Sequence, residues 1–179
     1  MSRKIETYTH ISTKKGDGGT SRNYSNDELP KTDILFETLG VIDELSSALG
    51  LASHYSRYDD YIRTIQLDLQ HINSLIATRA DDPRRGRLTV IDDETIERLE
   101  AWEQSILTEC RIEPRFVLPG SESSKEGAYL DLARAISRRV ERTVLRCVES
   151  YQRKDLDDVI RYVNRLSDLL FIMARSCDQ

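Results

Sequence analysis

The sequence lacks the residue patterns that mark metal-binding, disulfide-bonded and membrane proteins. Its 179 residues include only three cysteines and three histidines, and these form neither a CxxC pair nor a cluster with the spacing of zinc or di-iron ligands. We interpret the cysteines as reduced thiols packed as small hydrophobic residues. No apolar run approaches the ~20 residues of a membrane-spanning helix, and no secretory signal is visible. We therefore expect a cytoplasmic protein that does not act at a membrane.

The charge of the chain is unevenly distributed. The whole chain carries a formal net charge of −5. Residues 1–31 contain six basic and four acidic side chains, so this segment carries +2 and the remainder −7. An acidic protein with a basic, glycine-containing N-terminal segment suits a small anionic ligand better than a nucleic acid.

Apolar residues recur at helical spacing from residue 32 to the C-terminus. This periodicity predicts one helix over about 32–54 and a second over about 61–76. Asp92 is expected to cap a third helix and Asp155 a fifth. The fourth is expected to begin near Ser123, which has capping-box spacing to Glu126. No stretch alternates long enough to require a sheet. We therefore predict one all-α domain, a five-helix bundle with ferritin-like up-down packing (32–179), preceded by an irregular N-terminal nucleotide-binding arm (1–31).

The first candidate site is the loop TKKGDGGTSR at residues 13–22. Glycines allow backbone N–H groups to approach an anion closely, and the lysines supply positive charge. The loop is not a Walker A motif, because it lacks GxxxxGK[ST] and no strand precedes it. A flexible, solvated arm would have the same composition, so the loop alone leaves both interpretations open.

The second candidate site is a row of arginines on the fourth predicted helix. Arg134, Arg138 and Arg142 recur at i, i+4 and i+8 with Arg139 and Arg146 beside them. The first three form a stripe about 80° wide on the side of the helix away from the apolar face. Such like charges repel by a few tenths of a kcal/mol, and a polyphosphate bound bidentately would offset this cost. A solvated face relieved by Glu141 is the alternative, whereas the acidic balance disfavours nucleic acid.

Two further polar positions lie close to apolar helix faces. Asp43 borders the apolar stripe of the first predicted helix, where Arg134 is a candidate partner and a half-exposed aspartate is the alternative. Asn164 and Asp168 flank buried positions of the last predicted helix. Polar atoms so close to a packed face need partners, either within the protein or on a ligand.

Four blocks of this sequence, in this order, resemble the PduO-type ATP:cob(I)alamin adenosyltransferases over nearly the whole chain. They are TKKGDGGT (13–20) with the later Pro30 and Lys31, GVIDELS (40–46), FVLPG (116–120) with ARAISRRVER (133–142), and YVNRLSD (162–168). The resemblance implies a homotrimer with active sites between subunits. It also implies transfer of the 5′-deoxyadenosyl group of ATP to the cobalt of cob(I)alamin, which forms adenosylcobalamin and releases triphosphate.

The resemblance also implies roles for individual residues. ATP would be held by Thr13, Lys14, Lys15, Gly16, Ser21, Arg22 and Lys31 of the arm and, across the interface, by Arg138, Arg139, Glu141, Arg142 and Asn164. Arg138, Lys31 and Mg²⁺ would stabilise the leaving triphosphate. Asp43 would pair with Arg134 across subunits. Phe116 would displace the lower axial ligand of the corrinoid, which leaves a four-coordinate Co(II) that is easier to reduce.

The alternative function is a non-catalytic trimeric sensor of ATP or corrinoid on the same fold. As an enzyme, the protein would have a corrinoid reductase and a downstream adenosylcobalamin-dependent enzyme as partners. The chain departs from the family pattern on the corrinoid side, where Asp131 replaces a common histidine, Leu169 a tyrosine, and the turn after Gly120 is longer.

Overall fold

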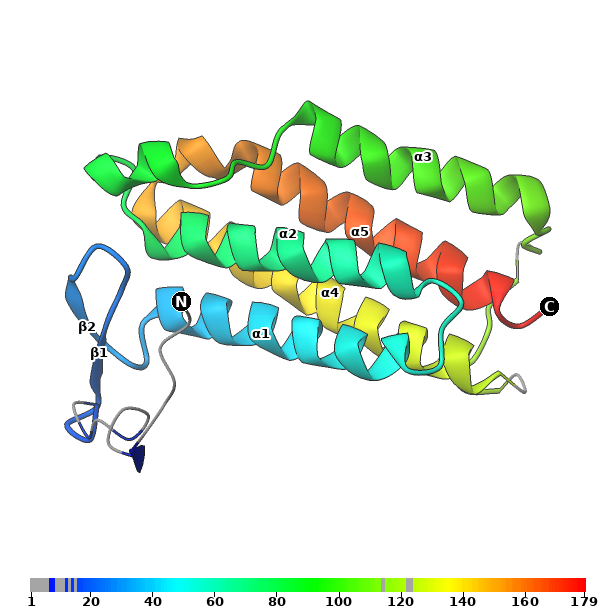
Figure 1. The fold of residues 1–179 in the computed structure, drawn as a ribbon, viewed down its shortest axis with the longest axis horizontal. Coiled ribbons are helices and arrows are strands. Elements are labelled where there is room, and N and C mark those ends of the chain that lie inside the picture. Colours follow the sequence, from blue (N-terminus) through cyan, green and yellow to red (C-terminus); the bar gives the residue numbers. More distant parts are fainter. Residues whose placement is uncertain (1–6, 9–11, 13, 15, 114, 122–123) are drawn as a thin grey trace.

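The fold is an all-α bundle, as predicted. A computed structural model describes residues 7–8, 12, 14, 16–113, 115–121 and 124–179. In this part of the chain the α-helices are α1 (Ile34–Ser53), α2 (Asp59–Ala77), α3 (Asp93–Glu109), α4 (Lys125–Tyr151) and α5 (Asp157–Ser176). Successive helices run in alternating directions along the long axis of the molecule (Figure 1). None of these described helices is long and apolar enough to cross a lipid bilayer.

The core lies between α1, α2, α4 and α5, with α3 on the outside. With 27 residues, α4 is about 40 Å long, and it packs against both α1 and α5. Helix α2 packs on α1, and α3 on α5 (Figure 1). Each helix contributes fully buried aliphatic side chains to one continuous core, among them Leu45, Ile65, Leu99, Val140 and Leu170. This packing leaves one long face of α4 outside the core.

Side-chain caps define several helix ends. Asp33 accepts a hydrogen bond from the Leu35 backbone N–H (2.8 Å) at the start of α1, and Asp92 caps α3 as predicted. Helix α4 is capped by Ser124 rather than Ser123, which lies outside the described residues. The predicted cap by Asp155 is wrong. Its carboxylate accepts instead from Arg153 (2.8 Å), and α5 begins two residues later without a side-chain cap.

The N-terminal arm contains a small sheet that the sequence did not predict. Strands β1 (Thr20–Arg22) and β2 (Glu28–Pro30) pair antiparallel, with Ser21 opposite Leu29. Strands of three residues are too short to display an alternating pattern. The signal that could have located the hairpin is its connection, NYSND (23–27), which is rich in turn-forming residues. The hairpin lies beyond the end of the bundle where α1 begins and α2 ends (Figure 1).

Candidate active site

Lys31 lies against the glycine-rich loop. Its backbone N–H donates to the carbonyl of Gly19 (2.8 Å). A Cβ atom on Gly16 would lie only 2.7 Å from the Lys31 Nζ, so the ammonium group rests over the bare backbone of this glycine. Gly19 has a φ of +81°, which favours glycine. The structure thus brings a cation next to a loop whose backbone an anion can approach closely.

The other predicted arm residues are near this loop or outside the described part of the chain. Lys14 is exposed, whereas Thr13 and Lys15 lie outside the described residues. Ser21 is half-buried on β1. Arg22 is exposed and pairs with Glu28 across the hairpin (2.8 Å). Because such exposed ion pairs contribute only about 0–1 kcal/mol, a triphosphate could compete for this arginine.

The arginine stripe of α4 is largely solvent-exposed, as predicted. Arg138 and Arg142 are exposed, and neither forms an ion pair with any described residue. Arg139 is also exposed but pairs with Glu44 of α1. Two guanidinium groups, one helical turn apart, are therefore available to an anionic ligand.

Asn164 faces the edge of this stripe from α5. Its side-chain amide donates to the Glu141 carboxylate (2.8 Å), so the structure brings together two residues that the sequence assigned to the ATP site. The Asn164 carbonyl oxygen and the second Glu141 oxygen stay available to accept hydrogen bonds from a ligand. The pair thus places a carboxylate and an amide beside the positively charged face of α4.

A buried hydrogen bond holds α5 in the orientation that presents Asn164. Tyr162 is fully buried and donates its hydroxyl to Asp68 of α2 (2.8 Å), and Asp68 also pairs with Arg98 of α3. Burial and then the negative charge of Asp68 raise the pKa of Tyr162 well above its usual value, so the phenol stays protonated. Since residues two apart project from nearly opposite sides of a helix, Asn164 points outward when Tyr162 points inward.

Asp43 and Arg134 do not pair with each other within the described chain. Asp43 is exposed and lines a groove of about 550 Å³ between α1 and α2. Arg134 is half-buried, with its Nε atom 3.5 Å from Asp131. Asp131 itself is only 3% exposed and accepts a hydrogen bond from Arg175 of α5 (2.6 Å). The sequence missed this buried cluster because Asp131 belongs to the otherwise solvent-facing side of α4.

Phe116 stands at the rim of a separate cleft. It is 87% exposed and borders a space of about 620 Å³ between the segment before α4 and helices α4 and α5. Apolar side chains including Val117 and Phe171 line it together with the charged Asp131 and Arg175. The cleft combines an accessible aromatic ring with charged groups, which suits a large ligand with polar substituents.

Within one chain, the two halves of the predicted ATP site do not meet. No hydrogen bond or ion pair joins residues 16–31 to Arg138, Arg139 or Arg142 among the residues that the structure describes. The same part of the chain contains no group of three or more His, Cys, Asp or Glu side chains that could enclose a metal ion.

Comparisons with known proteins assign this arrangement to a family. A family model described as cobalamin adenosyltransferase matches residues 11–177. The corrinoid adenosyltransferase MMAB of Homo sapiens is 33% identical over 97% of this chain and 71% of its own length. The corrinoid adenosyltransferase of Mycobacterium leprae is 34% identical over 93% of this chain and 90% of its own length.

Solved structures agree with this assignment. A variant of the PduO-type ATP:corrinoid adenosyltransferase from Lactobacillus reuteri, complexed with cobalamin and ATP, superposes with a TM-score of 0.84 at 28% identity, covering 94% of this chain and 93% of that one. A second variant of the same enzyme, complexed with ATP, superposes with a TM-score of 0.82 at 29% identity over 92% of both chains. The chain therefore belongs to the cobalamin adenosyltransferase family.

Proposed function

We propose that this protein transfers the 5′-deoxyadenosyl group of ATP to the cobalt of cob(I)alamin or a related corrinoid. The observation that carries the proposal is the pair of exposed arginines, Arg138 and Arg142, which have no ion-pair partner among the described residues. In the reaction, Co(I) supplies the electron pair of the new Co–C5′ bond. The C5′–O5′ bond breaks, and the triphosphate leaves with the electrons of that bond.

The protein residues act by holding the triphosphate and stabilising its charge. Arg138 and Lys31 donate to phosphate oxygens as negative charge develops on the leaving group, and preorganised donors of this kind contribute about 10²–10³ in rate. Arg142, Arg139 and the Glu141–Asn164 pair orient the rest of the nucleotide. The arm contributes its predicted residues, including Thr13 and Lys15. No protein nucleophile is required, because cobalt itself attacks C5′.

We place the complete site between subunits of a homotrimer. Among the residues that the structure describes, no hydrogen bond or ion pair joins the arm to Arg138, Arg139 or Arg142, so each can serve a site that the neighbouring subunit completes. Asp43 and Arg134, unpaired with each other in one chain, are free to pair across the interface. This arrangement gives each trimer three equivalent sites.

On the corrinoid side, Phe116 provides an apolar face against the lower side of the macrocycle. Exposure of 87% leaves its ring accessible to a ligand of that size. An apolar ring at this place excludes the lower axial ligand and favours the four-coordinate Co(II), which a corrinoid reductase or a chemical reductant converts to Co(I) by donating one electron. Any Mg²⁺ would arrive with the triphosphate, because this hard cation is commonly held by phosphate oxygens, water and one or two carboxylates. Glu141 is the carboxylate nearest to Asn164 and fits that role.

The test is incubation of the protein with ATP, Mg²⁺ and chemically reduced cob(I)alamin. We expect the absorption spectrum of Co(I) to change to that of an alkylcobalamin, with release of one triphosphate per turnover. Tight ATP binding without this spectral change would refute the catalytic function and support a sensor of ATP or corrinoid.

A further inference from the structure

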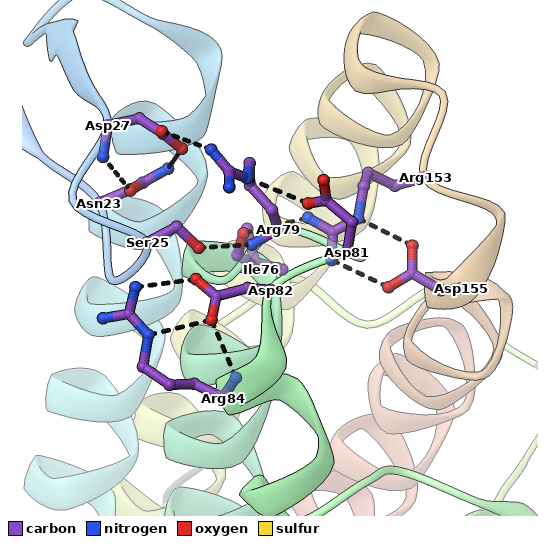
Figure 2. A network of polar contacts seen from close by, with 10 residues as sticks. All are labelled: Asn23, Ser25, Asp27, Ile76, Arg79, Asp81, Asp82, Arg84, Arg153 and Asp155. Atoms are coloured by element: carbon purple, nitrogen blue, oxygen red, sulfur yellow. Dashed lines mark hydrogen bonds and ion pairs between the residues drawn. The ribbon is translucent and has the colours of Figure 1, made fainter.

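The turn of the N-terminal hairpin is fixed to the end of α2, far from the glycine-rich loop in sequence. Figure 2 shows this contact. The Arg79 guanidinium donates to the Asp27 carboxylate (2.7 Å), and the Arg79 backbone N–H donates to the Ser25 hydroxyl oxygen (3.0 Å). The Tyr24 backbone N–H donates to the carbonyl of Ala77 (2.9 Å). The hairpin turn therefore acts as part of the C-terminal cap of α2, whose last carbonyls have no partner within the helix.

Further polar contacts surround the docked turn at the end of α2. Ser25 is buried and also hydrogen-bonds Asp82, and the hydrogen bonds from Arg84 and Ser25 hold the pKa of the Asp82 carboxyl well below its usual range. Arg153 donates to the carbonyl of Leu75 (3.1 Å) and to that of Ile76 (3.4 Å; Figure 2) in the last turn of α2. The end of α2 is thus held by Arg153 in addition to its contacts with the hairpin turn.

The hairpin needs this support because its own sheet is small. A two-stranded hairpin is marginally stable in water, and β1 and β2 have three residues each. At its other end, β2 continues through Lys31 to Asp33, which caps α1 and accepts a hydrogen bond from Tyr151 (2.7 Å). Attachment at Asp33 alone would let the hairpin pivot. Attachment at Asp27 as well fixes both ends of β2, and with it the position of Lys31.

We propose that Arg79 is a positioning residue for ATP, which acts by holding Asp27 and so the β1–β2 hairpin in the orientation that presents Gly16 and Lys31. This inference rests on the proposed function, since it assumes that the arm binds ATP. Without the Arg79–Asp27 ion pair, the backbone contacts of Tyr24 and Arg79 remain to hold the turn. ATP binding must then complete the ordering of the hairpin, so the affinity for ATP falls while the rate at saturating ATP is retained. An exposed ion pair contributes up to about 1 kcal/mol, which corresponds to about a fivefold change in affinity.

The test compares Arg79→Ala with two matched variants. Asp81 pairs with the same guanidinium (3.1 Å) but has no hydrogen bond or ion pair to the hairpin in the described part of the chain, so Asp81→Ala controls for loss of an ion pair at this place. Arg79→Lys keeps the charge. We expect Arg79→Ala to raise the KM for ATP about fivefold with kcat unchanged within about twofold. Arg79→Lys should restore most of the affinity, and Asp81→Ala should match the wild type.

Two readouts separate this inference from the proposed function. Calorimetric titration of each variant with ATP and Mg²⁺ measures the affinity without any corrinoid. Hydrogen exchange should be faster at residues 20–31 in Arg79→Ala and unchanged in the helices. A wild type that binds ATP but transfers no adenosyl group refutes the function and leaves the affinity comparison valid. Three results would overturn the positioning role. They are equal ATP affinities of the wild type and Arg79→Ala, a decrease in kcat alone, and a loss of ATP affinity in Asp81→Ala as large as that in Arg79→Ala.

Discussion

Replacement of Arg138 by alanine tests the role of the α4 stripe in catalysis. In the structure this guanidinium is exposed and has no ion-pair partner among the described residues, so its removal breaks no ion pair with them. Surface substitutions of this kind change the free energy of unfolding by about 0.5 kcal/mol or less. If Arg138 stabilises the leaving triphosphate, kcat should fall by about 10²–10³, or about 2.7–4 kcal/mol of transition-state stabilisation. The prediction is therefore a large kinetic effect with almost no effect on stability.

Arg146→Ala is the matched control. This residue lies on the same helix, is similarly exposed and pairs with Glu37 of α1 (2.7 Å), so its loss should lower stability by at most about 1 kcal/mol and leave turnover near normal. Turnover is followed by the Co(I)-to-alkylcobalamin absorbance change, and stability by thermal unfolding. Sedimentation measures whether both variants keep the same oligomeric state. Near-normal turnover of Arg138→Ala would refute the role assigned to the stripe.

Three other predictions concern stability, pH and assembly. Arg153→Ala should lower the unfolding free energy by about 2–3 kcal/mol, measured in denaturant, because it leaves α2 carbonyls uncapped at a site where the arginine is only 9% exposed. Burial, and then the charge of Asp168, raises the pKa of Glu103 to about 7 from 4.5. The folded state thus binds this proton more tightly, and stability falls as pH rises through that range. The Glu103→Gln variant should therefore have a higher melting temperature than the wild type at pH 8 and the same melting temperature at pH 4. If the proposed trimer pairs Asp43 with Arg134 across subunits, Asp43→Ala should weaken assembly and slow transfer at least about tenfold, and exchanging the two residues should restore both in sedimentation and activity assays.

The helical architecture was predictable because it follows from local periodicity. Apolar residues at threes and fours produce a buried face wherever the helices pack, so residues such as Leu45 and Val140 are fully buried as their spacing predicts. Caps were less predictable. Asp92 caps α3 as predicted. Asp155 instead forms an ion pair with Arg153, and local sequence does not reveal that this ion pair competes with capping of α5.

The candidate site was predictable only in part. Helical spacing alone places Arg138 and Arg142 on a common exposed face, and the resemblance of four sequence blocks to the adenosyltransferases added the identity of the ligand. The bonding of Glu141 to Asn164 depends on the packing of α4 against α5. The burial of Asp131 could not be predicted from the sequence, because the residue lies on the polar side of its helix and Arg175 of α5 covers it.

The sequence by itself therefore determined the helices, their buried faces and the positively charged stripe, because each depends on residues less than about two turns apart. Tertiary structure alone decided which side chains from distant segments meet. It places Lys31 over Gly16 and the Arg79 guanidinium against Asp27, 52 residues earlier. Such contacts depend on how the helices and the hairpin pack in space, which the spacing of residues along the chain does not specify.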